Sequence, residues 1–224
     1  MTARRPMLTA SFWRSRRSAA IAGMVFAVLL LLAMTMIRLA LSDDNIQSLQ
    51  TDAQRRSLIR LSLYVVPFAG IAFLWFIGVV REQLGDVEDR LFSTVFLGSG
   101  LLFLAMLFTG AVISTSLMEM LAESTPNADL FAFGRRNTQM LLSVYAMRMA
   151  AVFTLSVSTA GLRTSALPRW VSYLGYLVGL TLLVTAGERE WFQLLFPSWV
   201  LLVSLVILLV RPSTGTAIPG SAPG

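Results

Sequence analysis

Six long apolar runs, separated by short polar segments, dominate the chain. They cover residues 19–41, 61–80, 91–117, 139–161, 170–186 and 191–210. An α-helix needs about 20 mainly apolar residues to cross the hydrocarbon core of a bilayer, and a longer run is accommodated by tilting. The pattern therefore predicts an all-α fold, an integral membrane bundle of six transmembrane helices that spans residues 19–211.

The two flanks of this membrane domain differ in character. Residues 1–18 form a basic tail with five arginines and no acidic residue, and residues 212–224 are rich in Pro, Gly, Ser and Thr. The first composition predicts a cytoplasmic flank and the second a disordered tail. Because the first apolar run exceeds the roughly 7 to 15 residues of a signal-peptide core, we expect a retained anchor rather than a cleaved signal peptide.

The arginines between the runs predict an orientation. If the N-terminus is cytoplasmic, ten arginines lie on the inner side and six on the outer side, leaving out two that fall inside the runs. Positive residues in short loops accumulate on the cytoplasmic side, and the first helix usually dominates. We therefore expect both ends of the chain in the cytoplasm.

Composition excludes several kinds of chemistry. The 224 residues are 56% hydrophobic and 13% charged, with no histidine and no cysteine. The usual transition-metal ligands, a thiolate nucleophile and an imidazole base are all missing. The net charge of +6 comes from arginines in tails and short loops, which predicts orientation rather than nucleic-acid binding. We expect no cofactor, no metal site, no nucleic-acid partner and no enzymatic activity.

One charged residue, Arg148, lies near the middle of an apolar run, residues 139–161. A guanidinium at the bilayer centre costs roughly 2.5 to 3.5 kcal/mol on insertion scales, so it should face protein or water. Tyr145 and Glu119 are candidate partners for this intramembrane polar site. Three interpretations stay open: a structural tie between helices, a substrate or anion site, and a side chain that snorkels to water. The first predicts that Arg148→Leu lowers the folded yield.

Gly175 and Gly179 form a GxxxG spacing in the fifth run. This spacing places two glycines on one helix face, where another helix backbone can approach closely. The partner could be a helix of the same chain or of a second copy, and six spans in one chain favour packing within the chain.

An inverted repeat of three helices would relate the second run to the fifth. Three residues in each share their spacing, namely Arg60, Tyr64 and Gly70 with Arg169, Tyr173 and Gly179. Corresponding helix interruptions are the best pointer to such a repeat. Pro67 has no counterpart in the fifth run, so the sequence does not favour a repeat.

Two segments resemble parts of known bacterial proteins. They are Phe73 to Arg81 running into Asp89-Arg90-Leu91-Phe92, and Leu167-Pro168-Arg169-Trp170 with the following Leu174 to Gly179. They are similar to uncharacterised multi-span membrane proteins of high-GC bacteria such as actinobacteria. The resemblance implies six helices and a bacterial inner (plasma) membrane, and it implies no activity.

Two classes of function remain. The first is a non-catalytic accessory or scaffold protein, surrounded by membrane lipids and bound to a protein partner or to further copies of itself. The alternative is a small transporter or channel for an anionic solute that uses Arg148. A transporter requires a continuous polar cavity that reaches Arg148, whereas a scaffold should hold this residue in a closed contact.

Overall fold

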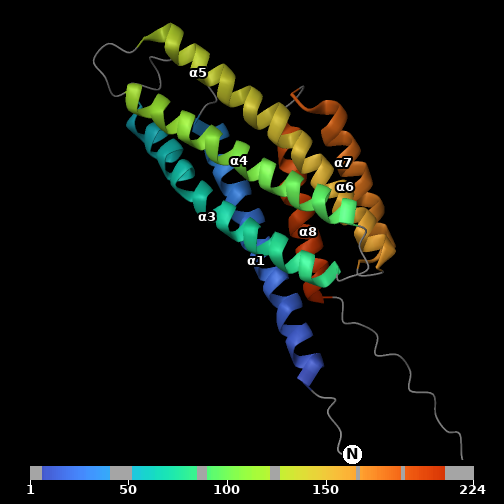
Figure 1. Cartoon of the computed structure of the whole chain (residues 1–224). Helices are drawn as coiled ribbons and strands as arrows, with labels where there is room; N and C mark the ends of the chain where they lie inside the picture. Colours follow the sequence, from blue (N-terminus) through green and yellow to red (C-terminus); the bar gives the residue numbers. More distant parts are fainter. Residues whose placement is uncertain are drawn as a thin grey trace, which may run out of the picture.

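The computed structural model describes residues 7–40, 52–84, 90–121, 127–164, 167–187 and 190–209. These parts contain helices and no strand, which confirms the all-α prediction (Figure 1). In chain order the helices are α1 (Met7–Ala40), α3 (Ala53–Leu84), α4 (Arg90–Met120), α5 (Ala128–Met140), the π-helix η2 (Leu141–Ala146), α6 (Met147–Arg163), α7 (Arg169–Thr185), the 3₁₀-helix η3 (Glu190–Leu194) and α8 (Leu195–Leu209).

Several of these helices match a bilayer in length and composition. Four stretches in the described residues are long and apolar enough to cross a membrane: Ala53–Arg81, Ser93–Met120, Ala128–Arg163 and Trp191–Leu209. Two further apolar helices are shorter, Ala20–Met36 and Arg169–Thr185. Large apolar side chains such as Trp75, Val184 and Leu209 lie exposed on the outer surface of the bundle. Burying such a surface in lipid is favourable. The chain is a helical membrane protein.

The helices extend beyond the apolar runs. The expected polar connection between residues 118 and 138 is wrong in its second half, because α5 begins at Ala128 and continues through η2 into α6. Similarly, α3 begins at Ala53 rather than near residue 61, and residues 7–18 of the basic tail belong to α1. The predicted disordered tail at 212–224 lies outside the described residues.

N-terminal caps explain where α3 and α5 begin. The side chain of Asp52 accepts hydrogen bonds from the backbone N–H groups of Gln54 and Arg55, at 2.9 and 3.1 Å. Asn127 does the same for Asp129 and Leu130, at 3.0 and 3.1 Å. Each cap satisfies backbone donors that the first helical turn leaves without partners. The polar sequences at these positions therefore start helices.

The helices pack around a cluster of seven phenylalanines. In this bundle α1 packs against α3 and α8, and α6 packs against α7 and α4. Five helices contribute the phenylalanine cluster, whose ring centroids lie 4.4 to 6.5 Å apart: Phe26, Phe73, Phe76, Phe96, Phe103, Phe153 and Phe196. None of these side chains is more than 1% exposed. Edge-to-face and tilted pairs of this kind add to the gain from burial.

Gly175 and Gly179 both face helices of the same chain. A Cβ on Gly179 would lie 2.7 Å from Leu155 Cγ and 3.2 Å from the carbonyl oxygen of Ala151, both on α6. A Cβ on Gly175 would overlap the Ser158 hydroxyl and approach Trp199 Nε1 to 2.9 Å. The GxxxG spacing thus allows α7 to approach α6 closely.

Candidate functional site

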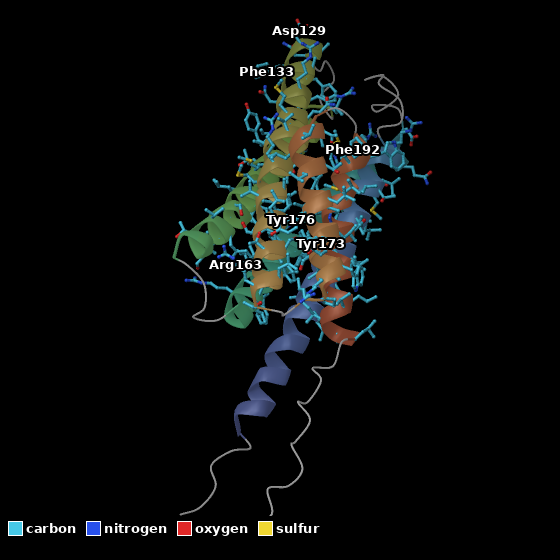
Figure 2. The ribbon with its side chains drawn as sticks, turned by 90° about the vertical axis from the view of Figure 1, so that its right-hand side faces the viewer. Asp129, Phe133, Arg163, Tyr173, Tyr176 and Phe192 are labelled. Atoms are coloured by element: carbon cyan, nitrogen blue, oxygen red, sulfur yellow. The ribbon has the colours of Figure 1, made fainter. Side chains whose placement is uncertain are left out.

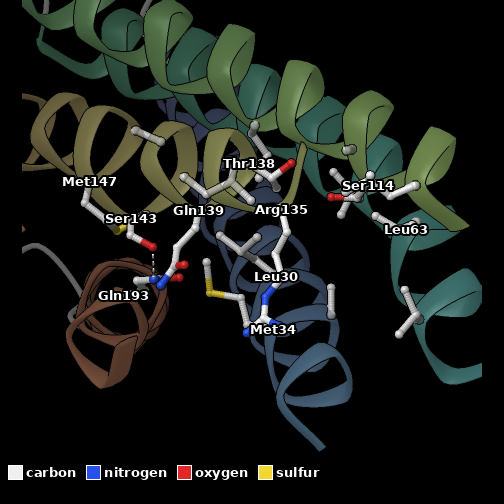
Figure 3. Close-up of a pocket in the computed structure, with 18 of the residues that line it drawn as sticks. Leu30, Met34, Leu63, Ser114, Arg135, Thr138, Gln139, Ser143, Met147 and Gln193 are labelled. Carbon is white, nitrogen blue, oxygen red and sulfur yellow. Dashed lines mark hydrogen bonds between the residues drawn. The ribbon is translucent and has the colours of Figure 1, made fainter. Parts of the chain in front are cut away.

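A cavity of about 550 Å³ lies in one half of the bundle, between α1, α3, α4, α5, η2, the start of α6 and η3 (Figure 3). We call the end of the bundle that carries α5 the upper end, as drawn in Figure 1. Leu30, Leu63, Val66 and Leu107 are among the side chains that make the walls on α1, α3 and α4 mainly apolar. The volume falls within the range of small-molecule sites, about 300 to 1,000 Å³.

The polar side chains of the cavity lie mainly on one wall. On this wall they are Arg135, Thr138 and Gln139 of α5, Ser143 of η2 and Gln193 of η3, and Ser114 of α4 adds a hydroxyl on another wall. Gln193 Nε2 donates a 2.6 Å hydrogen bond to Ser143 Oγ, which ties η3 to η2. Among the described residues that line this cavity, Arg135 is the one charged side chain, and the other polar groups of this wall are neutral.

Arg135 and Thr138 are the most informative members of this wall. Arg135 is half-buried, and Figure 3 shows its side chain extending from α5 toward the part of α1 that carries Leu30 and Met34. The Thr138 hydroxyl is buried and makes no hydrogen bond with any described residue. An unpaired buried hydroxyl costs about 1 to 3 kcal/mol, so a ligand or water that pairs with it is favoured.

The π-helix η2 forms the middle of this wall. Leu141–Ala146 follows α5 without a break, and its Ser143 and Ala146 are buried. A π-helical turn inside an α-helix changes the direction of side chains on its two sides and is frequent at functional sites. In this chain the π-helix η2 carries Ser143, which contacts Gln193 of η3. Figure 2 shows the long combined helix, with Asp129 and Phe133 at the upper end and Arg163 near the other.

The phenylalanine cluster closes the cavity at its lower end. Phe103 lines the cavity, and its ring centroid lies 6.4, 5.4 and 4.9 Å from those of Phe26, Phe73 and Phe196. Below this level, buried hydroxyls such as those of Thr154 and Ser158 donate to carbonyl groups of their own helix. The polar wall therefore ends at the aromatic layer rather than crossing the bundle.

One side of the cavity lies between α5, α1 and η3. Within the described ranges, α5 packs more against α4 and η2 than against α1 or η3. Arg135, Gln139, Met34 and Gln193 lie at the junction of these elements.

The residues predicted for an intramembrane polar site do not line this cavity. Arg148 is exposed on the outer surface of α6 and makes no hydrogen bond or ion pair with any described residue. Tyr145, 52% exposed, lies one turn earlier on the same side, and Glu119 is exposed near the end of α4. The structure thus brings Tyr145 and Arg148 together on the surface rather than in the interior.

Glu119 and Arg148 lie at different heights. A Cβ on Gly110 would contact Leu142, and one on Gly134 would contact Leu117, so α4 runs antiparallel to α5 and η2. This register places Glu119 level with Phe133, 15 residues before Arg148, or about 20 Å along the helix. Glu119 instead borders a shallow groove with Leu130 and Phe133. It is too far away to neutralise Arg148.

Sequence reasoning missed the cavity wall because it placed α5 in a loop. Had residues 128–140 been treated as helical, Phe131, Arg135, Thr138 and Leu142 would have fallen on one face at helical spacing. The available signal was Asn127 with Asp129 two residues later, the pattern of an N-cap with an acidic first turn.

The fold and the cavity define a class, the α-helical membrane proteins with an amphipathic cavity. Comparison of the chain with protein-family models, with curated proteins and with solved structures gives no match. Functional inference therefore depends on the geometry of this chain.

Proposed function

We propose that the chain is a non-catalytic accessory protein of a bacterial inner membrane, with both ends in the cytoplasm, which binds another membrane protein through α6. The observation that carries this proposal is the exposure of Arg148 and Tyr145 on the outer surface of the bundle. A guanidinium on a lipid-facing surface is costly, and a polar group on a neighbouring helix would remove that cost.

The transporter alternative has less support. It requires a polar path that reaches Arg148, and Arg148 does not line the cavity. The cavity also ends on the phenylalanine cluster, at Phe103. An accessory role requires no path across the bundle, which agrees with both observations. The closed contact that a scaffold should give Arg148 is absent among the described residues, so in this proposal the partner protein supplies it.

Site-specific photocrosslinking in native membranes tests the accessory role. A photoreactive phenylalanine analogue at Tyr145 is compared with the same analogue at Tyr64, a 70% exposed tyrosine on α3. We expect a discrete adduct with another membrane protein from Tyr145 only, and its loss when Arg148→Leu is added. Arg60→Leu, which removes an exposed arginine from α3, should leave the adduct unchanged.

Two results would contradict the accessory role. Equal crosslinking from Tyr145 and Tyr64, or adducts with lipid alone, would mean that α6 has no specific partner. An adduct of twice the mass of the chain would replace the accessory role with self-association through α6.

A further inference from the structure

The cavity combines a positive charge and an apolar interior in a fixed order along the helix axis. Arg135 lies three helical turns before Met147, which lines the lower part of the cavity beside Phe103. The walls opposite Arg135, formed by Leu30, Ala33 and Leu63, are apolar. A ligand that matches this order has an anionic group at one end and a hydrocarbon body at the other.

The depth of these groups matches the layers of a bilayer. Arg163 and Arg135 are 28 residues apart on one continuous helix, or about 40 Å. If Arg163 lies at one membrane surface, a hydrocarbon core of about 30 Å places Arg135 in the opposite headgroup region. Met147, about 24 Å from Arg163, then lies inside the core. The charge of the cavity is at headgroup depth and its apolar part at acyl-chain depth.

The sideways position of the cavity gives a membrane ligand a route to it. Within the described residues α5 packs less against α1 and η3 than against α4 and η2, and the cavity is lined at this junction by Arg135, Gln139, Met34 and Gln193. A molecule already dissolved in the outer part of the bilayer can enter there without leaving the membrane. A free anion in water would gain nothing from the apolar walls.

We infer that this cavity is a binding site for an anionic phospholipid. The phosphate is held by the Arg135 guanidinium, and one acyl chain descends along Leu63, Leu107 and Met147 to the phenylalanine cluster. The amide groups of Gln139 and Gln193 and the Thr138 hydroxyl supply hydrogen bonds to the ester or glycerol oxygens. This inference does not depend on the proposed accessory role, because Arg148 and Tyr145 lie outside the cavity.

Lipid binding to the purified full chain tests the inference. Native mass spectrometry from a nonionic detergent compares phosphatidylglycerol, phosphatidylcholine and inorganic phosphate as probes. We expect phosphatidylglycerol to remain bound most tightly, and Arg135→Gln to weaken it about tenfold, as expected for the loss of a charge-assisted hydrogen bond. Arg136→Gln is the matched control, because Arg136 is the adjacent exposed arginine and does not line the cavity.

A second pair of variants tests the apolar part of the site. Ala111→Phe places a ring in the cavity, whereas Ala105→Phe places one on the exposed face of the same helix, α4. The first should reduce binding of both phospholipids, and the second should not.

Equal losses from the two arginine variants, equal binding of the two phospholipids, or wild-type binding by a folded Ala111→Phe would each overturn the inference. Binding of phosphate alone as tightly as the lipid would make this a free-anion site and would also overturn it.

Discussion

At the scale of single residues, the position of Arg148 in the structure differs from the one that its sequence context predicts. An arginine inside an apolar run predicts a buried tie, yet here the side chain is exposed and has no partner among the described residues. Periodicity alone does not say which face of α6 the bundle buries, because apolar residues surround Arg148 on every side of the helix. The neighbouring Ala150 and Ala151, both 0% exposed, mark the face that is packed.

The first prediction follows from that exposure. Arg148→Leu should leave the thermal midpoint of the detergent-solubilised protein within the range expected for a surface change, about 0.5 kcal/mol in stability, because no partner in the described structure loses a contact. Ala150→Leu, on the packed face of the same helix, should lower the midpoint by an amount equivalent to about 1 to 3 kcal/mol. A large drop of the thermal midpoint with Arg148→Leu would mean that the Arg148 side chain is packed in the interior of the bundle.

Glycine substitutions give a second prediction with opposite signs. Gly179→Ala should destabilise the protein by about 1 to 3 kcal/mol, because the new methyl group would press on Leu155 and on the backbone of α6. Gly98→Ala on α4 should stabilise it by about 0.5 to 1 kcal/mol, since a Cβ there meets no atom within 4 Å. Thermal unfolding of both variants in one detergent checks the signs, and a stabilising Gly179→Ala would mean that α7 does not pack closely on α6.

At the scale of helices, the sequence predicts the apolar centres well and the polar ends poorly. The runs at 61–80 and 91–117 lie inside α3 and α4, but hydropathy cannot detect that α3 begins at Ala53 or that α5 exists. Those ends are stabilised by capping at Asp52 and Asn127. Caps are local polar signals, and a reading based on hydrophobic spacing treats them as loops.

The cap of α3 provides the third prediction. Asp52→Ala removes the acceptor for two backbone N–H groups and also the 3.2 Å ion pair with Arg55 Nε, and it should cost about 1 kcal/mol. Asp52→Asn keeps the capping oxygen and loses only a partly exposed ion pair, so its cost should be clearly smaller. Thermal midpoints of the two variants separate the contributions. If both fall equally, the charge rather than the cap stabilises this end of α3.

At the scale of the whole molecule, the helical class could be predicted from the sequence, but the cavity could not. Its walls come from seven elements, and Arg135 and Gln193 are 58 positions apart in the chain. The walls meet through contacts between distant segments, such as the Gln193–Ser143 hydrogen bond between η3 and η2 and the close glycine contacts at Gly110 and Gly134 that align α4 with α5 and η2. No local pattern encodes such a register, because small residues are compatible with many helix partners.

Orientation in the membrane is the fourth prediction, and the chain suits a direct test because it has no cysteine. Asp129→Cys places a single thiol on exposed α5 at the upper end, and Thr164→Cys places one at the opposite end of the same continuous helix. The excess of arginines at the lower ends predicts that this side is cytoplasmic. A membrane-impermeant maleimide should therefore label Asp129→Cys in intact cells and Thr164→Cys only after permeabilisation. The reverse pattern would place both chain ends outside, and labelling of both in intact cells would mean that the helix does not span the bilayer.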